Sequence, residues 1–459
     1  MAADGSREPS PNSPSHVFPR HMRTNLPTVA SGNGVYLTDK TGKTYLDGSS
    51  GAAVSSIGHG DPDVIAAIKA QLDDIAFAHT GFFTSEPAEQ LASVLSDRAP
   101  GDLEHVYFVS GGSEAVEAAL KLARQYHLEN GQPQRTKLIA RKRSYHGNTL
   151  GALAAGGSPW RRAQFEPLLI DVAHIDPPFA YRLQDEGEDD EAFALRMADK
   201  LEEELQRLGP ETVIAFIAET VGGATAGAIH GPPSYLQRIR EICDRHGVLL
   251  ILDEVMCGMG RTGHLFACQE DGVVPDIVCI AKGLGGGYQP IGAMICRDHV
   301  YQTIEQGTGF FQHGHTYIGH PTACAAGLAV MGKMTGSSTG ETGGLVARCH
   351  AQGEKLTAAL RERFGQHAHV GDIRGRGLFR ALEFVADRET KQPFPAEKAV
   401  AATLKKAALE AGLICYPMPG TIDGKRGDHV LLAPPFIITD AQIGELVDKL
   451  AIAVDKATA

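Results

Sequence analysis

The chain has 459 residues, 43% of them hydrophobic and 21% charged, which is enough to build ordinary buried cores in two or more domains. Its 55 acidic and 43 basic side chains leave a net charge of −12, which argues against a nucleic-acid binder, because such proteins cluster Lys and Arg against phosphates. No apolar run approaches the ~20 residues that span a membrane, and the N-terminus lacks the apolar core of a signal peptide. The eight cysteines lie in the second half without a CxxC pair. We therefore expect a reduced, cytoplasmic protein without a membrane partner.

The first part of the chain predicts a leader, a hairpin and several helices. Residues 1–20 are rich in Pro and Ser and predict a disordered leader. Residues 35–47 alternate apolar and polar side chains around Thr41-Gly42-Lys43, which predicts a β-hairpin. Helical spacing follows over 63–72 and 87–95, and a short strand over 106–109 runs into a helix over 114–127.

Strand-like and helical segments then alternate through the middle of the chain. The strand-like segments are 137–140, 213–218, 248–252, 277–281 and 293–296, and the helical ones include 197–208 and 234–246. This alternation predicts an α/β fold with a mostly parallel sheet covered by helices. The acidic residues 184–191 predict a solvated loop, and the Gly-rich residues 335–344 predict a flexible connector.

The residues after the connector predict a second, smaller α+β unit. They contain a helix over 345–364, a strand-rich segment over 370–385, a helix over 396–411 and a closing helix from about 439. We divide the chain into the leader (1–20), an N-terminal segment that packs with the small domain (21–70), a large domain (71–334) and a C-terminal small domain (345–459).

Three segments carry residues suited to chemistry, and the first is the strand-to-helix turn Val109-Ser-Gly-Gly-Ser-Glu114. A helix start with two glycines exposes backbone N–H groups at the positive end of the helix dipole, which suits a phosphate. The alternative is that Ser113 is only an N-cap with Glu114 in the first helical turn.

The second segment is an apolar strand that ends in two carboxylates, Asp253 and Glu254. Ligands of open α/β sheets bind at the carboxyl ends of strands, so a carboxylate there could hold a metal or a protonated ring nitrogen, or could cap a helix. Gly258–Gly263 matches the pattern GxGxxG, but the carboxylates separate it from the strand and no convincing helix follows. The context therefore disfavours a dinucleotide site.

The third segment places one lysine, Lys282, after an apolar strand and before the glycines of Gly283–Gly287. A desolvated amine at a strand end is what Schiff-base chemistry requires, whereas a surface lysine that only covers apolar side chains would need no such setting. A phosphate-binding helix start, a strand-end Asp and a strand-end Lys together match the inventory of a pyridoxal-phosphate site.

The chain resembles the class III, or omega, aminotransferases of fold-type I pyridoxal-phosphate enzymes from about residue 20 to the C-terminus. The resemblance is carried by ordered segments that include VSGGSEAVEAALKLAR, RSYHGNT, AETVGGATAGA, LILDEVMCGMGRTG, DIVCIAKGLGGGYQPIGA and HGHTYIGHPTACAAG. It implies a large domain with a mostly parallel sheet of seven strands, a smaller α+β domain, pyridoxal 5′-phosphate as cofactor, and a homodimer or possibly a tetramer.

The resemblance also implies roles for individual residues. Lys282 would form the Schiff base and move a proton, and Asp253 would keep the ring nitrogen protonated. Gly112 and Ser113 would hold the phosphate. The remaining implied cofactor contacts are Tyr145 and Val255 on the two faces of the ring, Glu219 near its hydroxyl, and Thr316 donated to the phosphate by the neighbouring subunit.

Departures from the family pattern concern the substrate pocket. Leu431 stands where many relatives that take α-amino acids present an Arg, Ala224 stands where relatives acting on ornithine present a Glu, and Ala53 stands where several aryl-amine relatives present a Trp. Phe82 and Phe83 would form an aromatic wall or pack helices. Of the adjacent Arg161 and Arg162, at most one could contact a 2-oxo acid, because neighbouring side chains point in different directions.

These features predict an aminotransferase that moves an amino group from a primary amine, diamine or omega-amino acid to pyruvate or 2-oxoglutarate by a ping-pong mechanism. The alternatives are an aminomutase, racemase or decarboxylase of the same fold, or a cofactor-binding protein without turnover. Four histidines lie in glycine-rich segments, but none has the i, i+4 spacing with an acidic partner that favours zinc, so we predict no metal site.

Overall fold

The computed structural model describes residues 16–338, 340 and 342–459. Residues 1–15 of the predicted leader and residues 339 and 341 of the predicted connector lie outside the described residues. Residues 16–20 form no helix or strand. None of the helices within the described residues is long and apolar enough to cross a membrane.

A seven-stranded sheet forms the centre of the large unit, and its strand order is β4-β10-β9-β8-β7-β5-β6. The strands are β4 (Leu103–Val109), β5 (Lys137–Arg141), β6 (Val172–Ile175), β7 (Val213–Glu219), β8 (Leu249–Asp253), β9 (Ile277–Ile280) and β10 (Gly292–Arg297). Strands β6, β5, β7, β8 and β9 run parallel, whereas β10 is antiparallel to both β9 and β4. Every residue of β7, β8 and β9 is buried, as expected for strands covered on both faces. The predicted α/β class is confirmed.

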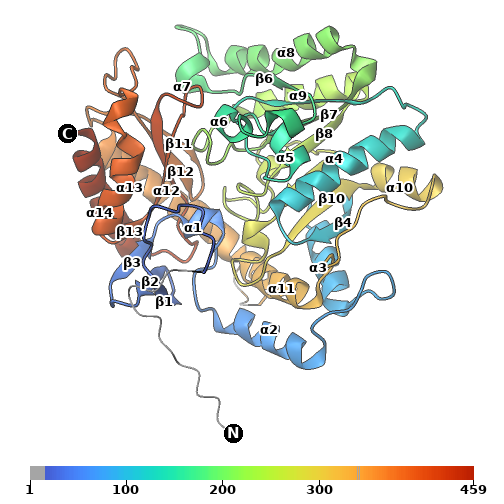
Figure 1. The fold of residues 1–459 in the computed structure, drawn as a ribbon, viewed down its shortest axis with the longest axis horizontal. Helices are drawn as coiled ribbons and strands as arrows, with labels where there is room; N and C mark the ends of the chain where they lie inside the picture. Colours follow the sequence, from blue (N-terminus) through green and yellow to red (C-terminus); the bar gives the residue numbers. More distant parts are fainter. Residues whose placement is uncertain (1–15, 339, 341) are drawn as a thin grey trace.

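Helices cover both faces of this sheet (Figure 1). The helices of this part of the chain are α3 (Glu86–Ser96), α4 (Gly112–Glu129), α5 (Leu150–Ala155), α6 (Pro159–Arg162), α7 (Ala180–Leu183), α8 (Asp190–Leu208), α9 (Pro233–His246), α10 (Asp298–Gln306) and α11 (Pro321–Thr335), and α2 (Pro62–Asp74) packs on α11. Apolar side chains of α4, α5 and α10 form one core with the strands, and those of α3, α8, α9 and α11 form a second core on the other face.

The smaller unit is built on an antiparallel sheet of order β11-β12-β15-β14. Its elements are β11 (Val370–Arg376), β12 (Phe379–Phe384), β14 (Tyr416–Pro419), β15 (Asp428–Leu432), α12 (Gly344–Phe364), α13 (Val400–Glu410) and α14 (Asp440–Thr458). Figure 1 shows this unit beside the large sheet, with the N-terminal strands against it.

The N-terminal hairpin pairs with a strand of the C-terminal unit and not with the large sheet. Strands β1 (Val29–Asn33), β2 (Tyr36–Asp39) and β3 (Thr44–Asp47) form a sheet with β13 (Leu413–Ile414). Strand β3 is parallel to β13, with Leu46 opposite Leu413. Ile57, Leu46 and Val64 join the buried core of the C-terminal unit.

Two local expectations are wrong in detail. Helix α8 begins at Asp190, inside the acidic run expected to be loop, because the side chain of Asp189 accepts a hydrogen bond from the Ala192 N–H and caps the helix. Helix α11 continues to Thr335, the first residue of the expected connector, and ends at Gly336 in a left-handed conformation.

Candidate active site

The candidate site lies where three neighbouring parallel strands end at the carboxyl edge of the large sheet. Strand β7 ends at Glu219, β8 ends at Asp253, and β9 is followed within two residues by Lys282. Glu219 and Asp253 are directly paired across β7 and β8. All three side chains line one cavity of about 300 Å³. The sheet topology therefore brings together residues that are 29 to 63 positions apart in the sequence.

The N-terminus of α4 lines the same cavity with Gly112 and Ser113. Gly111 is the N-cap residue and makes no side-chain cap, so Ser113 is not the N-cap that the simpler interpretation required. A Cβ atom on Gly112 would lie 2.6 Å from Cγ1 of Val255, so only glycine fits there without movement. The Ser113 hydroxyl accepts a hydrogen bond from the Asn148 N–H at 3.0 Å. This end of the helix offers backbone donors and a positive dipole to an anion.

The two carboxylates after β8 have different surroundings. Asp253 faces the cavity, and its Oδ2 lies 2.7 Å from Nδ1 of the buried His146, whose Nε2 has no hydrogen-bond partner. Glu254 points away and accepts hydrogen bonds from the N–H groups of Ala267 and Cys268 and from the Thr220 hydroxyl. Asp253 is therefore the carboxylate available to a ligand, and Glu254 organises the loop.

Lys282 is held in an unusual backbone conformation inside the protein. Its φ of 45° lies in the left-handed region, which a non-glycine residue adopts at a cost of about 1–3 kcal/mol. Burial lowers the pKa of the Lys282 amine, and the charges of Asp253 and Glu219 oppose that shift. Burial also raises the pKa of Glu219, whose Oε1 accepts a hydrogen bond from the Gly223 N–H. A buried amine with a lowered pKa can be neutral part of the time, which nucleophilic or proton-transfer chemistry needs.

Tyr145 and Val255 also line this cavity, and both are half-buried. Burial raises the pKa of the Tyr145 hydroxyl, so the ring is neutral. Lining residues that were not predicted from the sequence include Val54, Met256, Gln289, Pro290 and Ile291. Gln289, Pro290 and Ile291 follow soon after the glycine-rich loop behind Lys282, which is the signal that could have indicated them.

Ala53, Ala224 and Leu431 come together in one apolar cluster next to this cavity. Met256 belongs to both the cluster and the cavity lining, and Tyr416 packs against the cluster from β14. Leu431 is 1% exposed and sits opposite Tyr416 in the antiparallel pair of β14 and β15. The wall that the smaller unit contributes is therefore apolar at these positions.

Phe82, Phe83 and Thr316 do not line the cavity of Lys282 in this chain. Phe82 and Phe83 are 82% and 67% exposed, and Thr316 is also exposed. Phe83 lines a separate groove together with Ile318. The segments around these residues meet, because the ring of Phe77 lies 5.5 Å from that of Tyr317.

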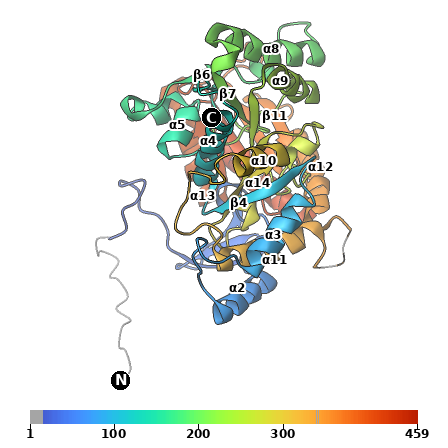
Figure 2. The same cartoon turned by 90° about the vertical axis from the view of Figure 1, so that its right-hand side faces the viewer.

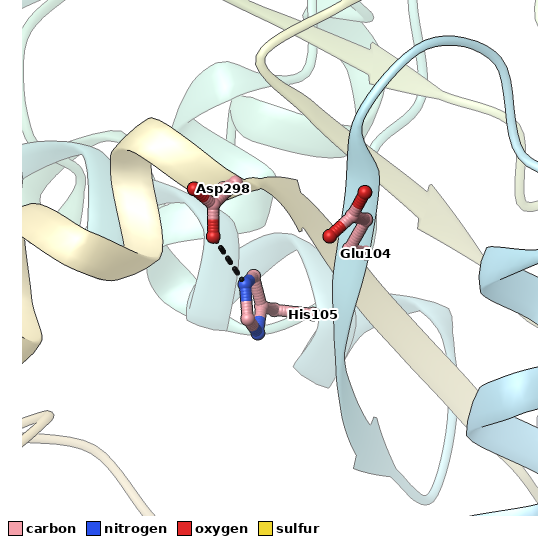
Figure 3. A group of neighbouring side chains, drawn as sticks. All are labelled: Glu104, His105 and Asp298. Atoms are coloured by element: carbon pink, nitrogen blue, oxygen red, sulfur yellow. Dashed lines mark hydrogen bonds and ion pairs between the residues drawn. The ribbon is translucent and has the colours of Figure 1, made fainter.

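A group of three potential metal-ligand side chains lies elsewhere, on the outer strand β4 and the start of α10. Figure 3 shows His105 directed toward Asp298, with Glu104 nearby. Nε2 of His105 is 3.0 Å from Oδ1 of Asp298, and this hydrogen bond lowers the pKa of the Asp298 carboxyl. The His105 ring also stacks on Tyr301 with ring centroids 3.8 Å apart. A hydrogen bond and a ring contact therefore account for the placement of His105 and Asp298.

Residues Gly258–Gly263, which match the pattern GxGxxG, form turns, and no helix begins within them. Arg261 within them is buried and donates hydrogen bonds to the carbonyls of Leu378 and Pro434. This segment therefore joins the two units, and its geometry does not match a dinucleotide fingerprint.

Comparison with known proteins identifies the family. Residues 17–454 match the family model described as aminotransferase class-III. An uncharacterised aminotransferase of Schizosaccharomyces pombe is 45% identical over 93% of this chain and 92% of its own length. The solved (S)-enantioselective omega-transaminase of Thermomicrobium roseum superposes with a TM-score of 0.89 at 36% identity, covering 97% of each chain. The omega-transaminase of Pseudomonas jessenii, solved in complex with PMP, gives a TM-score of 0.88 at 32% identity over 96% of each chain. The recognised resemblance and the fold-type I class are confirmed, and the chain belongs to the class III aminotransferases.

Proposed function

We propose that this enzyme is a pyridoxal-phosphate-dependent aminotransferase that moves an amino group from a primary amine, diamine or omega-amino acid to a 2-oxo acid, pyruvate or 2-oxoglutarate, by a ping-pong mechanism. The observation that carries the proposal is the convergence of Lys282, Asp253 and the N-terminus of α4 on one cavity. The family membership and the PMP complex of the Pseudomonas jessenii relative support it.

The residues around the cavity fit pyridoxal phosphate. Gly112 leaves no space for a Cβ atom, because Val255 lies against it. The N-terminus of α4, which begins at Gly112, suits a phosphate held by Gly112 and Ser113. The buried Asp253 carboxylate suits a protonated ring nitrogen, and Tyr145 and Val255 suit the two ring faces. Glu219 would lie near the ring hydroxyl. When bound, this cofactor supplies a carbonyl that condenses with amines and a ring that withdraws electrons.

Three side chains around the cavity, those of Lys282, Asp253 and His146, then have defined roles. Nζ of Lys282 would hold the cofactor through its carbonyl group, and as a free amine it would accept and return a proton, which its lowered pKa favours. The Asp253 carboxylate would face the ring nitrogen, and Nδ1 of His146 fixes the orientation of this carboxylate. Asp253 and Glu219 are buried, so charges at this site act more strongly than they would in open solvent.

The apolar wall indicates the class of amine donor. Leu431 offers no charged donor to a carboxylate, and Ala53 and Ala224 leave room beside Met256. If the α-carboxylate of a donor lay against this wall, it would lose its hydration without gaining a charged partner, which costs binding free energy. We therefore expect donors that have no carboxylate, or one that lies far from the reacting amine, besides the amino acid that each acceptor itself forms.

We also propose a homodimer in which Thr316 of the partner subunit completes the phosphate site. Phe82, Phe83, Phe310 and Tyr317 are exposed large apolar side chains on two loops that meet at Phe77. Exposed apolar groups gathered in this way mark association surfaces. A tetramer is compatible with the same surface.

A donor panel tests the reaction. Aryl amines, diamines, omega-amino acids and α-amino acids are each offered with pyruvate or 2-oxoglutarate, and the cofactor absorbance is followed with amine alone and after addition of the acceptor. We expect a spectral change with amine alone that the acceptor reverses, and the fastest rates with donors that lack a nearby carboxylate. Isomerisation or release of carbon dioxide without an acceptor would instead indicate an aminomutase, racemase or decarboxylase. A strict preference for α-amino acids would contradict the interpretation of Leu431.

A Lys282→Ala variant tests the role of the lysine independently of the substrate. Borohydride reduction should fix the cofactor covalently to Lys282 in the natural protein and should leave the variant unlabelled, as read by mass spectrometry of the peptide. We expect the variant to lose essentially all turnover. Full activity of this variant would refute the mechanism.

A further inference from the structure

The adjacent residues Arg161 and Arg162 on the short helix α6 have opposite environments. The guanidinium of Arg162 donates hydrogen bonds to the carbonyls of Ala154 and Gly156 and forms an ion pair with Glu166 at 3.3 Å. Its donors are therefore used to hold the end of α5 against α6. Arg162 is a structural residue and is not available to a ligand.

The side chain of Arg161 lies against two aromatic rings and has no hydrogen-bond partner among the described residues. Its guanidinium carbon is 4.4 Å from the ring centroid of Trp160 and 4.7 Å from that of Tyr145. Its Nε is buried without a hydrogen-bond partner, and no ion pair joins Arg161 to a carboxylate within the described part of the chain. Burial lowers the pKa of Arg161, and the charge of Arg20 adds to this shift. A half-buried cation with unused donors is costly unless an anion occupies the site.

The position of Arg161 connects the cofactor cavity with the apolar wall. Tyr145 lines the cavity of Lys282, and Arg161 contacts its ring. The second tyrosine whose charge acts on Arg161 is Tyr416, the residue opposite Leu431. Arg161 therefore contacts a residue that lines the cavity of Lys282, and it is close enough to feel the charge of the tyrosine opposite Leu431.

We propose that Arg161 is the residue that binds the carboxylate of the 2-oxo acid acceptor. The inference rests on the proposed aminotransferase function, because every acceptor of that reaction carries a carboxylate. A guanidinium held against two aromatic rings still has N–H groups to offer, and a guanidinium can bind a carboxylate with two parallel N–H donors. The ring contacts restrict the side chain before the ligand arrives, so less conformational entropy is lost on binding.

Trp160 allows binding to be measured without turnover. It is the only tryptophan of the chain, and Arg161 lies against its ring, so an anion bound to Arg161 should change its fluorescence. The holoenzyme is titrated with glutarate, a dicarboxylate that cannot accept an amino group, at constant ionic strength. We expect a saturable change in the natural protein that weakens about 10-fold or more in Arg161→Gln, as for loss of charged hydrogen bonds.

Arg20→Gln is the matched control, because Arg20 is a second arginine whose charge acts on both Arg161 and Tyr145. This variant should keep a saturable response with nearly unchanged affinity. An equal loss in both variants would show that the region only attracts anions through its general charge. An unchanged titration in Arg161→Gln would overturn the proposal outright.

Steady-state kinetics give the second measurement. In Arg161→Gln we expect KM for pyruvate or 2-oxoglutarate to rise about 10-fold or more with a smaller change in kcat, because a charged hydrogen bond to the acceptor is lost. The half-reaction with an amine that lacks a carboxylate should keep its rate. An unchanged KM for the acceptor would overturn the assignment of Arg161. Failure of the amine half-reaction in the natural protein would instead overturn the proposed function, so the two failures are distinguishable.

Discussion

At the scale of single residues, the phosphate-binding end of α4 depends on the missing side chain of Gly112. We predict that Gly112→Ala weakens cofactor retention and destabilises the protein by about 1–3 kcal/mol, because the new Cβ would lie 2.6 Å from Val255 Cγ1. Thermal unfolding and dialysis against cofactor-free buffer measure the two effects.

The neighbouring glycine supplies the control for this substitution. A Cβ atom on Gly111 meets no atom within 4 Å, and its φ of 177° is extended backbone that any residue adopts. Gly111→Ala should therefore leave the stability of the cofactor-free protein nearly unchanged. Equal effects of the two substitutions would contradict the close-approach explanation.

The sequence predicts those site residues that follow an apolar strand segment. It does not predict residues whose role depends on how distant segments pack together. Lys282 and Asp253 stand out because each follows a run of apolar residues, and strand ends meet at one edge of the sheet. The contrast between Arg161 and Arg162 is invisible in the sequence. It depends on where Tyr145 and the carbonyls of α5 lie around a helix of four residues.

At the scale of elements, one buried histidine joins β15 to the loop that carries Ala224. Nε2 of His429 donates to the Ala224 carbonyl at 3.1 Å, and its Nδ1 lies 2.7 Å from the Thr421 hydroxyl. Burial lowers the pKa of His429 to about 3, and Arg374 adds to this shift. The ring is therefore neutral in the folded protein under ordinary conditions.

This histidine predicts how stability depends on pH. Below the pKa of about 6.5 that His429 has in the unfolded chain, the unfolded chain binds a proton on this ring and the folded protein does not. The free energy of unfolding therefore keeps the contribution of His429 above this pH and loses it progressively as the pH falls toward 3. The contribution is at most about 1.4 kcal/mol per pH unit in this window. Urea unfolding across the window should show a shallower loss for His429→Gln than for the natural protein. Parallel curves for the two proteins would contradict this prediction.

Among the elements, long periodic segments were predicted well and connections were not. The helix expected over 345–364 and the strand expected over 213–218 agree with α12 and β7 within one residue at each end. The antiparallel direction of β10 could not be predicted, because a buried strand has the same apolar pattern in either direction. Short elements such as α6 and α7 carry too few residues to show a period.

At the scale of the whole molecule, the exposed phenylalanines predict the oligomeric state. We expect Phe82→Asp to shift the protein from dimer to monomer and to weaken cofactor retention, because Thr316 of the partner would be lost from the phosphate site. Sedimentation equilibrium and cofactor absorbance measure the two effects. Ile452→Asp is the control, since Ile452 is 59% exposed on α14 and away from these loops. A natural protein that sediments as a monomer would contradict the proposed assembly.

Figure 2 shows β4 in front of α14 and α12, close to α10, in a view from the side of the molecule. In the sheet, β4 is bonded only to β10, with Val109 opposite Gly292, although the two strands are far apart in the sequence. During synthesis, the strand that leads into the phosphate-binding turn therefore has no partner until the ribosome has released residues beyond β10. Asp253 and Lys282 are synthesised before β10, so the cofactor cavity can be completed only after β10 has been made. Until then, the backbone N–H and C=O groups of β4 have no partner strand in this sheet.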